Sequence, residues 1–189
     1  MKNDWSIRND FLNAIGEFSV QFSKLEDCIT ELSSFTCDDI AYWQVEYFGN
    51  LGLDLNSKRD LVKKFIKSEL PILKDEWNNI NMSIGRVNHH RRHLIHGTAI
   101  SYLLRSPIKT RIKIKKRVES EEYTVKDIRN LTQELNIIMT GEHGLCGNFN
   151  TKFKTEAFNW YNSNDKFERK IIYKVNNAVQ TDWKGSNDK

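Results

Sequence analysis

The segment HHRRHLIHG, residues 89–97, combines two arginines with four of the chain's five histidines. Histidine accepts and releases protons near neutral pH, and a guanidinium stabilises negative charge that develops on a phosphate. Imidazole nitrogens also bind metal ions. The segment is therefore suited to metal binding, to phosphodiester cleavage, or simply to carrying solvated charge at the end of a helix.

Three histidines of this segment are spaced to share one helix face. His89, His93 and His96 stand at i, i+4 and i+7, so they offer three nitrogen ligands to one metal ion. Known three-histidine sites usually draw one ligand from another element, and no acid lies near these residues in the sequence to orient the rings. Arg91 and Arg92 also raise the local positive potential. These points favour a site with no metal and no cofactor, and they leave a metal-dependent hydrolase built on the three histidines as an alternative.

Solvated charge is the simplest alternative, because the helix dipole favours cations near a C-terminus. This interpretation suits Arg92 but not Arg91, which continues the apolar seam of the expected helix. A guanidinium at such a position needs a charged partner or an interface in which it stays hydrated. The seam positions before Arg91 are all apolar: Leu73, Trp77, Ile80, Ile84 and Val87.

Metal-free RNA cleavage is the third possibility. It needs a base that activates the ribose 2′-OH and a cation that stabilises the charged phosphorane. Arg91 and His96 supply these two groups, but residues five apart lie about 140° apart around an ideal helix. The two side chains can converge where the ends of paired helices meet at a two-fold axis, which predicts a homodimer.

Residues 91–97, RRHLIHG, resemble the R-x4-H signature of HEPN domains, often written R-[NDH]-x-L-[IV]-H-G. The FSVQFSKLED stretch of the expected first helix also fits that family's helical bundle. The resemblance implies a dimeric, metal-independent endoribonuclease in which Arg91 contacts the scissile phosphate and His96 acts in acid–base catalysis, leaving a 2′,3′-cyclic phosphate. Family members act in toxin–antitoxin, abortive-infection and CRISPR-associated antiviral defence and in RNA processing. The resemblance leaves open control by an antitoxin or by an activating nucleotide.

Two residues depart from the family's pattern. Arg92 stands where the family usually has Asn, Asp or His, and Thr98 where many toxin members have Tyr. These departures keep open an inactive HEPN-like module that binds RNA, a nucleotide or a partner protein. A second pair, Arg86 with His93, has a tolerated spacing but lacks the following glycine.

The surrounding sequence is strongly basic. No Asp or Glu occurs between Glu76 and Glu119, and ten Lys and Arg lie from Arg86 to Arg117, although the net charge of the chain is only +4. A basic segment on an acidic body predicts salt-sensitive binding to a polyanion, here RNA. The alternative is a solvated edge strand whose lysines prevent aggregation. The predicted RNA-binding residues are Arg92, His93, Arg105, Lys109, Arg111, Lys113, Lys115 and Arg117.

Most elements that must position these residues are expected to be helices. Apolar residues at alternating steps of four and three predict a long helix over 6–35. Further helices are expected after Asp38 or Asp39, after Asn56 or Ser57, from Pro71 to Gly97, from Thr124 to Gly141, and in pieces over 152–179.

Apolar residues recur at every second position only after Gly97. It predicts strands over 99–105 and 109–118, the second with a wholly basic face. The predicted fold is therefore mainly α, a HEPN-like helical bundle with a β-hairpin inserted at about 98–118. We expect one domain over 1–180 and a flexible tail over 181–189.

The composition places this fold in a soluble protein. Apolar residues make up 39% of the chain, enough for a core, while two prolines and nine glycines argue against an all-β sandwich. There is no apolar run of membrane-spanning length and no secretory signal. Three cysteines without CxxC spacing fit free thiols in a reducing cytosol. The sequence predicts a cytoplasmic protein that makes no use of a membrane.

Overall fold

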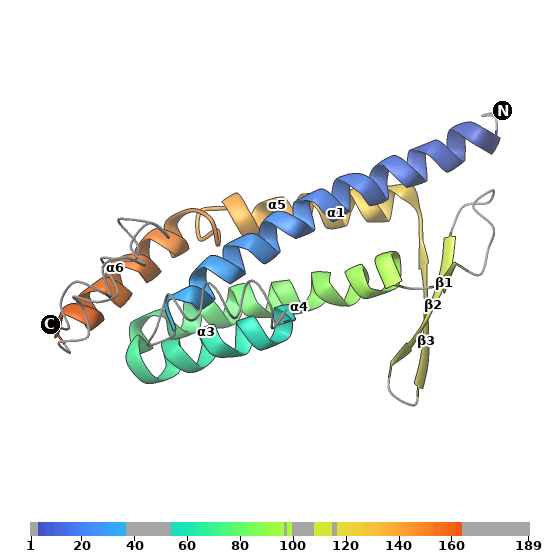
Figure 1. Ribbon diagram of the computed structural model, residues 1–189. Coiled ribbons are helices and arrows are strands. Elements are labelled where there is room, and N and C mark those ends of the chain that lie inside the picture. The colour runs from blue at the N-terminus through green and yellow to red at the C-terminus, as the bar shows by residue number, and fades with distance from the viewer. Residues whose placement is uncertain (1–3, 37–53, 97, 100–107, 115–116, 164–189) are drawn as a thin grey trace, which may run out of the picture. The chain divides into compact units, whose positions relative to one another are not determined.

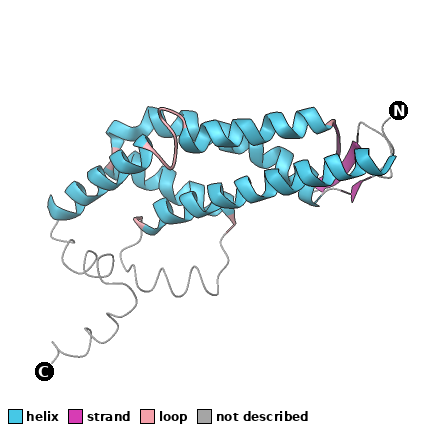
Figure 2. Cartoon of the chain, turned by 90° about the horizontal axis from the view of Figure 1, so that it is seen from above, coloured by secondary structure: helices cyan, strands magenta, loops and turns pink. Residues whose placement is uncertain are grey.

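The computed structural model describes residues 4–36, 54–96, 98–99, 108–114 and 117–163 (Figure 1). The protein is mainly α, as predicted, and it contains an antiparallel β-hairpin that lies between α4 and α5 in the sequence (Figure 2). In chain order the elements are α1 (Asp4–Ser34), α3 (Leu55–Glu69), the 3-10 turn η2 (Pro71–Leu73), α4 (Lys74–His96), β1 (Thr98–Ala99), β2 (Ile108–Ile114), β3 (Arg117–Tyr123), α5 (Val125–Thr140) and α6 (Asn148–Ser163).

The chain divides into two compact units, each assembled from separate stretches of sequence. The first comprises residues 1–27 and 78–147, and the second comprises residues 28–77 and 148–189. The hairpin, α5 and the C-terminal part of α4 all belong to the first unit. The residues that the sequence singles out for chemistry therefore lie within one unit.

The core of the first unit confirms the predicted helical seams. Apolar side chains of α1, α4 and α5 are buried at the expected spacing of three and four residues, which removes their surface from water and stabilises the fold. On α4 the buried seam continues to Val87, and the next seam position is Arg91, as the sequence predicts. The fully buried members of this core are Phe11, Ala14, Phe18, Leu25, Ile84, Val87, Ile128, Leu135 and Leu145.

The second unit is packed around aromatic rings. Trp77 stacks on Phe149 with centroids 5.8 Å apart, and Phe153 meets the edge of Phe35 at 5.8 Å. Phe149 and Phe153 lie on α6, so this helix accounts for part of the helical structure expected over 152–179. The expected helix after Asp38 or Asp39 and the expected tail over 181–189 lie outside the described residues.

Two helix starts differ in detail from the sequence prediction. Helix α3 begins at Leu55, and its cap is Asp54 rather than Asn56 or Ser57, because the Asp54 carboxylate accepts a hydrogen bond of 2.7 Å from the Ser57 backbone N–H. This bond lowers the pKa of Asp54. Pro71 opens the 3-10 turn that leads into α4, where its fixed φ and missing N–H are tolerated.

The hairpin is formed by different strands from those predicted. The expected strand over 109–118 is divided, because β2 ends at Ile114 and Arg117 begins β3. β2 pairs antiparallel with β3, from Ile108 opposite Tyr123 to Ile114 opposite Arg117. The sequence of β3, RVESEEY, lacks alternating apolar residues, so no strand is predicted there. Of the expected strand over 99–105, only β1 is described, and it pairs with β2.

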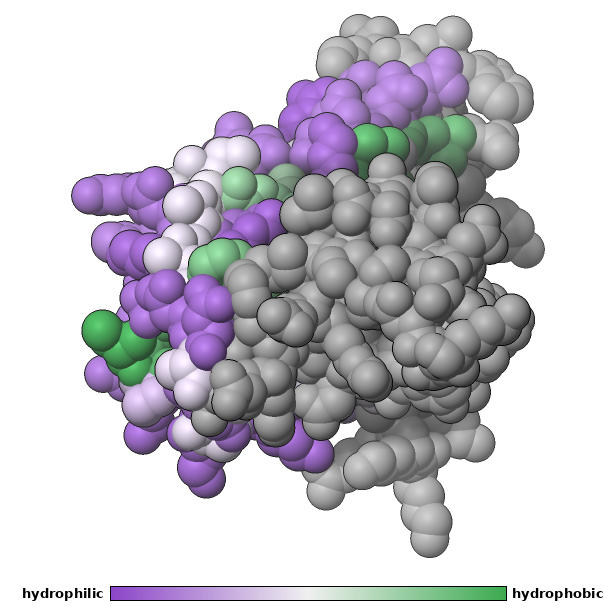
Figure 3. Space-filling view, turned by 60° about the vertical axis from the view of Figure 1, so that its left-hand side comes forward, coloured by the Kyte–Doolittle hydropathy of each residue, from purple (hydrophilic) through white to green (hydrophobic). Residues whose placement is uncertain are grey.

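The described helices include none that is both long and apolar enough to cross a membrane. The face drawn in Figure 3 is mostly hydrophilic over the described residues, with isolated apolar side chains. Cys28 and Cys146 are disulfide-bonded, so the prediction of free thiols is wrong for these two residues. An odd cysteine count without CxxC spacing does not exclude disulfide bonding, which is why the sequence argument fails here.

Helix α5 begins with a reciprocal cap that holds the end of the hairpin to the helix. The Asp127 backbone N–H donates to the Thr124 hydroxyl at 3.1 Å, and the Thr124 backbone N–H donates to the Asp127 carboxylate at 2.7 Å. The Thr124 side-chain hydroxyl also donates to this carboxylate, and together these bonds lower the pKa of Asp127 below its ordinary value. This capping box fixes the start of the helix as predicted.

We expect Thr124→Ala to lower the free energy of unfolding by about 1 kcal/mol in urea at neutral pH. Because Asp127 has a lowered pKa in the folded state, the stabilisation is complete above the unfolded pKa and is lost as pH falls through the folded one. The difference between variant and wild type should therefore shrink in acid. Thr132→Ala, inside α5, is the matched control and should not destabilise the protein. Equal effects of the two substitutions would contradict the capping role.

Candidate functional site at the C-terminal end of helix α4

The cations of the acid-free segment meet carboxylates that other elements supply. The Arg86 guanidinium donates two hydrogen bonds to Glu134 of α5. The ammonium of Lys109 lies 3.0 Å from the carboxylate of its cross-strand neighbour Glu122. Folding therefore gives a carboxylate partner to cations of this segment that have none nearby in the sequence. It also occupies Arg86, the cation of the second predicted Arg–His pair.

Arg91 has the partner that its seam position requires. Its side chain is 27% exposed, and its guanidinium lies 3.5 Å from the Glu26 carboxylate of α1. The guanidinium carbon also lies 4.9 Å from the centroid of the Phe22 ring, one turn before Glu26. This distance is within the range of a cation–π contact. The two contacts hold the guanidinium in place while part of it remains accessible to solvent.

His96 is the last residue of α4, and its side chain is exposed. It makes no hydrogen bond or ion pair with the part of the chain that the structure describes, so it can meet a ligand or a second copy of the chain. Arg92, between the two predicted catalytic residues, is half-buried. Thr98 lies in β1.

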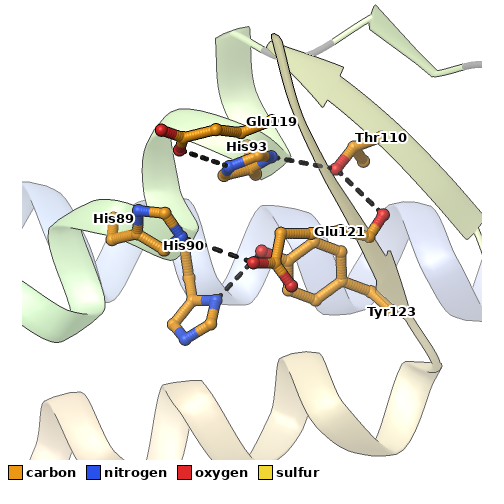
Figure 4. A network of polar contacts seen from close by, with 7 residues as sticks. All are labelled: His89, His90, His93, Thr110, Glu119, Glu121 and Tyr123. Atoms are coloured by element: carbon orange, nitrogen blue, oxygen red, sulfur yellow. Dashed lines mark hydrogen bonds and ion pairs between the residues drawn. The ribbon is translucent and has the colours of Figure 1, made fainter. Parts of the chain in front are cut away.

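His93 lies at the centre of a polar network between α4 and the hairpin (Figure 4). Its ring is 0% exposed, and its Nδ1 lies 3.3 Å from the hydroxyl of Thr110 on β2. The Thr110 hydroxyl donates in turn to the Glu121 carbonyl at 3.3 Å. Burial lowers the pKa of His93, and the neighbouring ring of His89 adds to this effect. The buried ring offers no surface for the RNA contact that the sequence predicts for His93.

A second histidine of α4 reaches the same strand. Nδ1 of His90 lies 2.9 Å from the hydroxyl of Tyr123, which is 3% exposed. Burial lowers the pKa of His90 and raises the pKa of the Tyr123 phenol, so both groups are neutral near pH 7. The hairpin is therefore fixed to α4 by two histidines, each paired with a buried hydroxyl.

Glu119 and Glu121 of β3 complete the network and are not predicted from the sequence. The Glu121 carboxylate lies 3.5 Å from Nε2 of His89, and the Glu119 carboxylate lies 3.9 Å from Nε2 of His93. With Tyr123 they occupy alternate positions of β3 and approach α4 together (Figure 4). Their alternation was the available signal, but it becomes visible only once a strand is assigned there.

The predicted basic strand face is partly wrong. Lys109, Arg111 and Lys113 occupy alternate positions of β2, whereas Arg117 lies on β3. Lys109 and Arg111 are exposed on the face opposite Thr110, and therefore on the side of the hairpin away from His93. Arg105 and Lys115 lie outside the described residues.

An open pocket adjoins the network within the same unit. It lies between β3 and the first turns of α5 and has a volume of about 290 Å³. Four of its lining residues carry carboxylates, so its electrostatic potential disfavours a phosphate group. The lining residues are His90, Glu121, Glu122, Tyr123, Asp127, Asn130, Leu131 and Glu134.

No family model, curated protein or solved structure matches this chain. The resemblance of residues 91–97 to the HEPN signature therefore rests on that motif itself.

We expect Tyr123→Phe to lower the free energy of unfolding by about 1 kcal/mol, because it removes the hydroxyl that pairs with His90. Urea unfolding followed by circular dichroism measures this change. Glu122→Gln is the matched control, since its exposed ion pair with Lys109 is expected to contribute less than about 1 kcal/mol. An unfolding midpoint of Tyr123→Phe equal to that of wild type would show that the His90–Tyr123 bond does not hold the hairpin to α4.

Proposed function

We propose that this protein is a HEPN-type, metal-independent endoribonuclease that works as a homodimer in prokaryotic defence or in a toxin–antitoxin response. Arg91 stabilises the charge on the scissile phosphate, and His96 transfers protons to and from the ribose 2′-OH and the leaving oxygen. The observation that carries the proposal is the RRHLIHG motif at the end of α4, with a held guanidinium and an exposed imidazole.

The environment of Arg91 supports a role in binding phosphate. A guanidinium that is already held in place loses little conformational entropy when it binds an anion. More of the interaction free energy is therefore left to stabilise the transition state. Glu26 lies 3.5 Å from one guanidinium nitrogen, and the remaining N–H groups make no hydrogen bond with the described residues. These donors are suited to a phosphate oxygen, which arginine binds through its planar fork.

Dimerisation follows from the position of the two residues on one helix. The side chains of Arg91 and His96 project about 140° apart around α4, so one copy does not bring both to the same phosphate. A two-fold axis beside the C-terminal ends of two α4 helices places Arg91 and His96 of both copies around one cleft. The exposed end of α4, which carries Ile95 at 40% exposure, provides apolar surface for this contact.

A catalytically inactive HEPN-like module that binds RNA, a nucleotide or a partner protein is the second candidate. Arg92 and Thr98 depart from the family's pattern, and Glu26 competes with a phosphate for Arg91. Such a module binds RNA or its partner without cleaving it, which distinguishes it from the enzyme.

We expect the wild-type protein to cleave a mixed-sequence RNA in excess EDTA. Arg91→Ala and His96→Ala should each reduce the rate at least about 100-fold, since each removes a group that acts in the transition state. Arg129→Ala and His143→Ala, which replace exposed residues of the same types outside the site, are the matched controls. Cleavage that survives in His96→Ala would overturn the assignment, and binding without cleavage would favour the inactive module.

We also expect the protein to have twice the monomer mass in native mass spectrometry and in light scattering. The reason is that a site shared between two copies is complete only in the dimer. An active enzyme that remains monomeric at the concentration of the assay would contradict the shared site while leaving the roles of Arg91 and His96 open to the substitution test.

A further inference from the structure

We propose that His89, His93 and Glu119 form a binding site for one divalent transition-metal ion of the zinc class, between helix α4 and strand β3. The site is separate from Arg91 and His96, and it does not depend on the proposed ribonuclease activity. It joins two elements that are far apart in the sequence but belong to the same compact unit.

The three side chains already lie close to a ligand arrangement. His89 and His93 are one turn apart on α4 with ring centroids separated by 4.9 Å, and each of the three residues offers one ligand atom within 4.8 Å of the others. Ligand atoms of a tetrahedral zinc ion lie roughly 3.4 Å apart. The distance of 3.9 Å from His93 Nε2 to the Glu119 carboxylate is near this value. His89 and Glu119 are 41% and 40% exposed, so their side chains have room to close the remaining distance.

The hydrogen bonds of His93 leave its Nε2 free to bind a metal ion. The Thr110 hydroxyl has one proton and donates it to the Glu121 carbonyl, so its oxygen accepts from Nδ1–H of His93. In the neutral ring the lone pair is then on Nε2. Metal-binding histidines commonly have this arrangement, in which the second ring nitrogen donates to a fixed oxygen acceptor.

Nε2 of His93 is a buried acceptor without a hydrogen-bond partner among the described residues. The Glu119 carboxylate lies 3.9 Å from this nitrogen, and a carboxylate is only an acceptor when it is ionised. Two acceptors that face each other across 3.9 Å repel, and burial makes the unsatisfied nitrogen costly. A cation bound between them removes both penalties.

The structure also supplies the negative charge that the sequence lacks near these histidines. Glu119 contributes one ligand, and Glu121, 3.5 Å from Nε2 of His89, is placed to orient that ring. Arg91 is paired with Glu26, so its charge is partly compensated. Residues of β3 thus supply the acids that the sequence lacks nearby, and Glu26 of α1 compensates one of the two adjacent arginines.

The donor set favours zinc over magnesium or calcium. Two imidazoles and one carboxylate are typical ligands of zinc, whereas magnesium and calcium prefer oxygen ligands alone. Three protein ligands leave a fourth position for water or for a ligand from solution. The bound ion connects β3 to α4 and so holds the hairpin, with its exposed Arg111, in one position relative to the helix that carries Arg91.

Equilibrium dialysis of untagged, EDTA-treated protein against Zn²⁺ tests the site directly. We expect one zinc ion per chain for wild type, and at least a tenfold weaker affinity for His89→Ala and for Glu119→Gln. Both replaced side chains are partly exposed, so the variants are expected to fold, which circular dichroism checks. The buried His93 is not needed for the test.

Two control variants distinguish this site from other sources of zinc affinity. Glu122→Gln lies on the same strand facing away from the site, and His96→Ala removes the third histidine of the helix face; both should bind zinc as wild type does. The proposal would be overturned by wild-type protein that binds no zinc, by unchanged affinity in the two ligand variants, or by loss of binding in His96→Ala. None of these outcomes depends on RNA cleavage, so the two proposals fail independently.

Discussion

Compensation of the positive charge at the end of α4 is the constraint on which the rest of the first unit depends. After Glu76, helix α4 contains no acid, and neither does strand β2, yet this part of α4 carries histidines and arginines that meet other elements of the unit. Each carboxylate that meets them comes from elsewhere: Glu26 from α1, Glu119 and Glu121 from β3, and Glu134 from α5. Without Glu26 a half-buried guanidinium would oppose folding, and without the Thr110 hydroxyl a buried imidazole would do the same.

The hairpin has a structural role that its basic composition does not predict. One face of β2 and β3 supplies Thr110, Glu119, Glu121 and Tyr123 to the histidines of α4, and the other presents Lys109 and Arg111 to solvent. The same element therefore packs against α4 and presents to solvent the cations that the proposed contact with an RNA backbone requires. The contacts of the first face with α4 fix the position of the hairpin and therefore of Lys109 and Arg111. The stability of these contacts is thus linked to the proposed function.

The helical layout was predictable because apolar spacing on one helix face reports burial directly. The seam of α4, the cap at Thr124 and even the exceptional position of Arg91 follow from spacing alone. The partner of Arg91 was not predictable, because Glu26 is distant in sequence and nothing local selects it among the other acids. The environment of His93 was missed for a related reason: β3 has no apolar alternation, so the strand and the carboxylates it brings to the helix leave no local signal.

The central claim is that Arg91 and His96 perform phosphodiester chemistry without a metal. The end groups of the cleaved RNA test this claim most directly. Attack by the neighbouring 2′-OH leaves a 2′,3′-cyclic phosphate and a 5′-hydroxyl, whereas a metal-activated water leaves a phosphate on one end and an intact 2′-OH. Sequencing of products formed in excess EDTA should show only cyclic phosphate ends. Products with a 3′-hydroxyl and a 5′-phosphate, or cleavage that appears only after a divalent metal is added, would contradict the account.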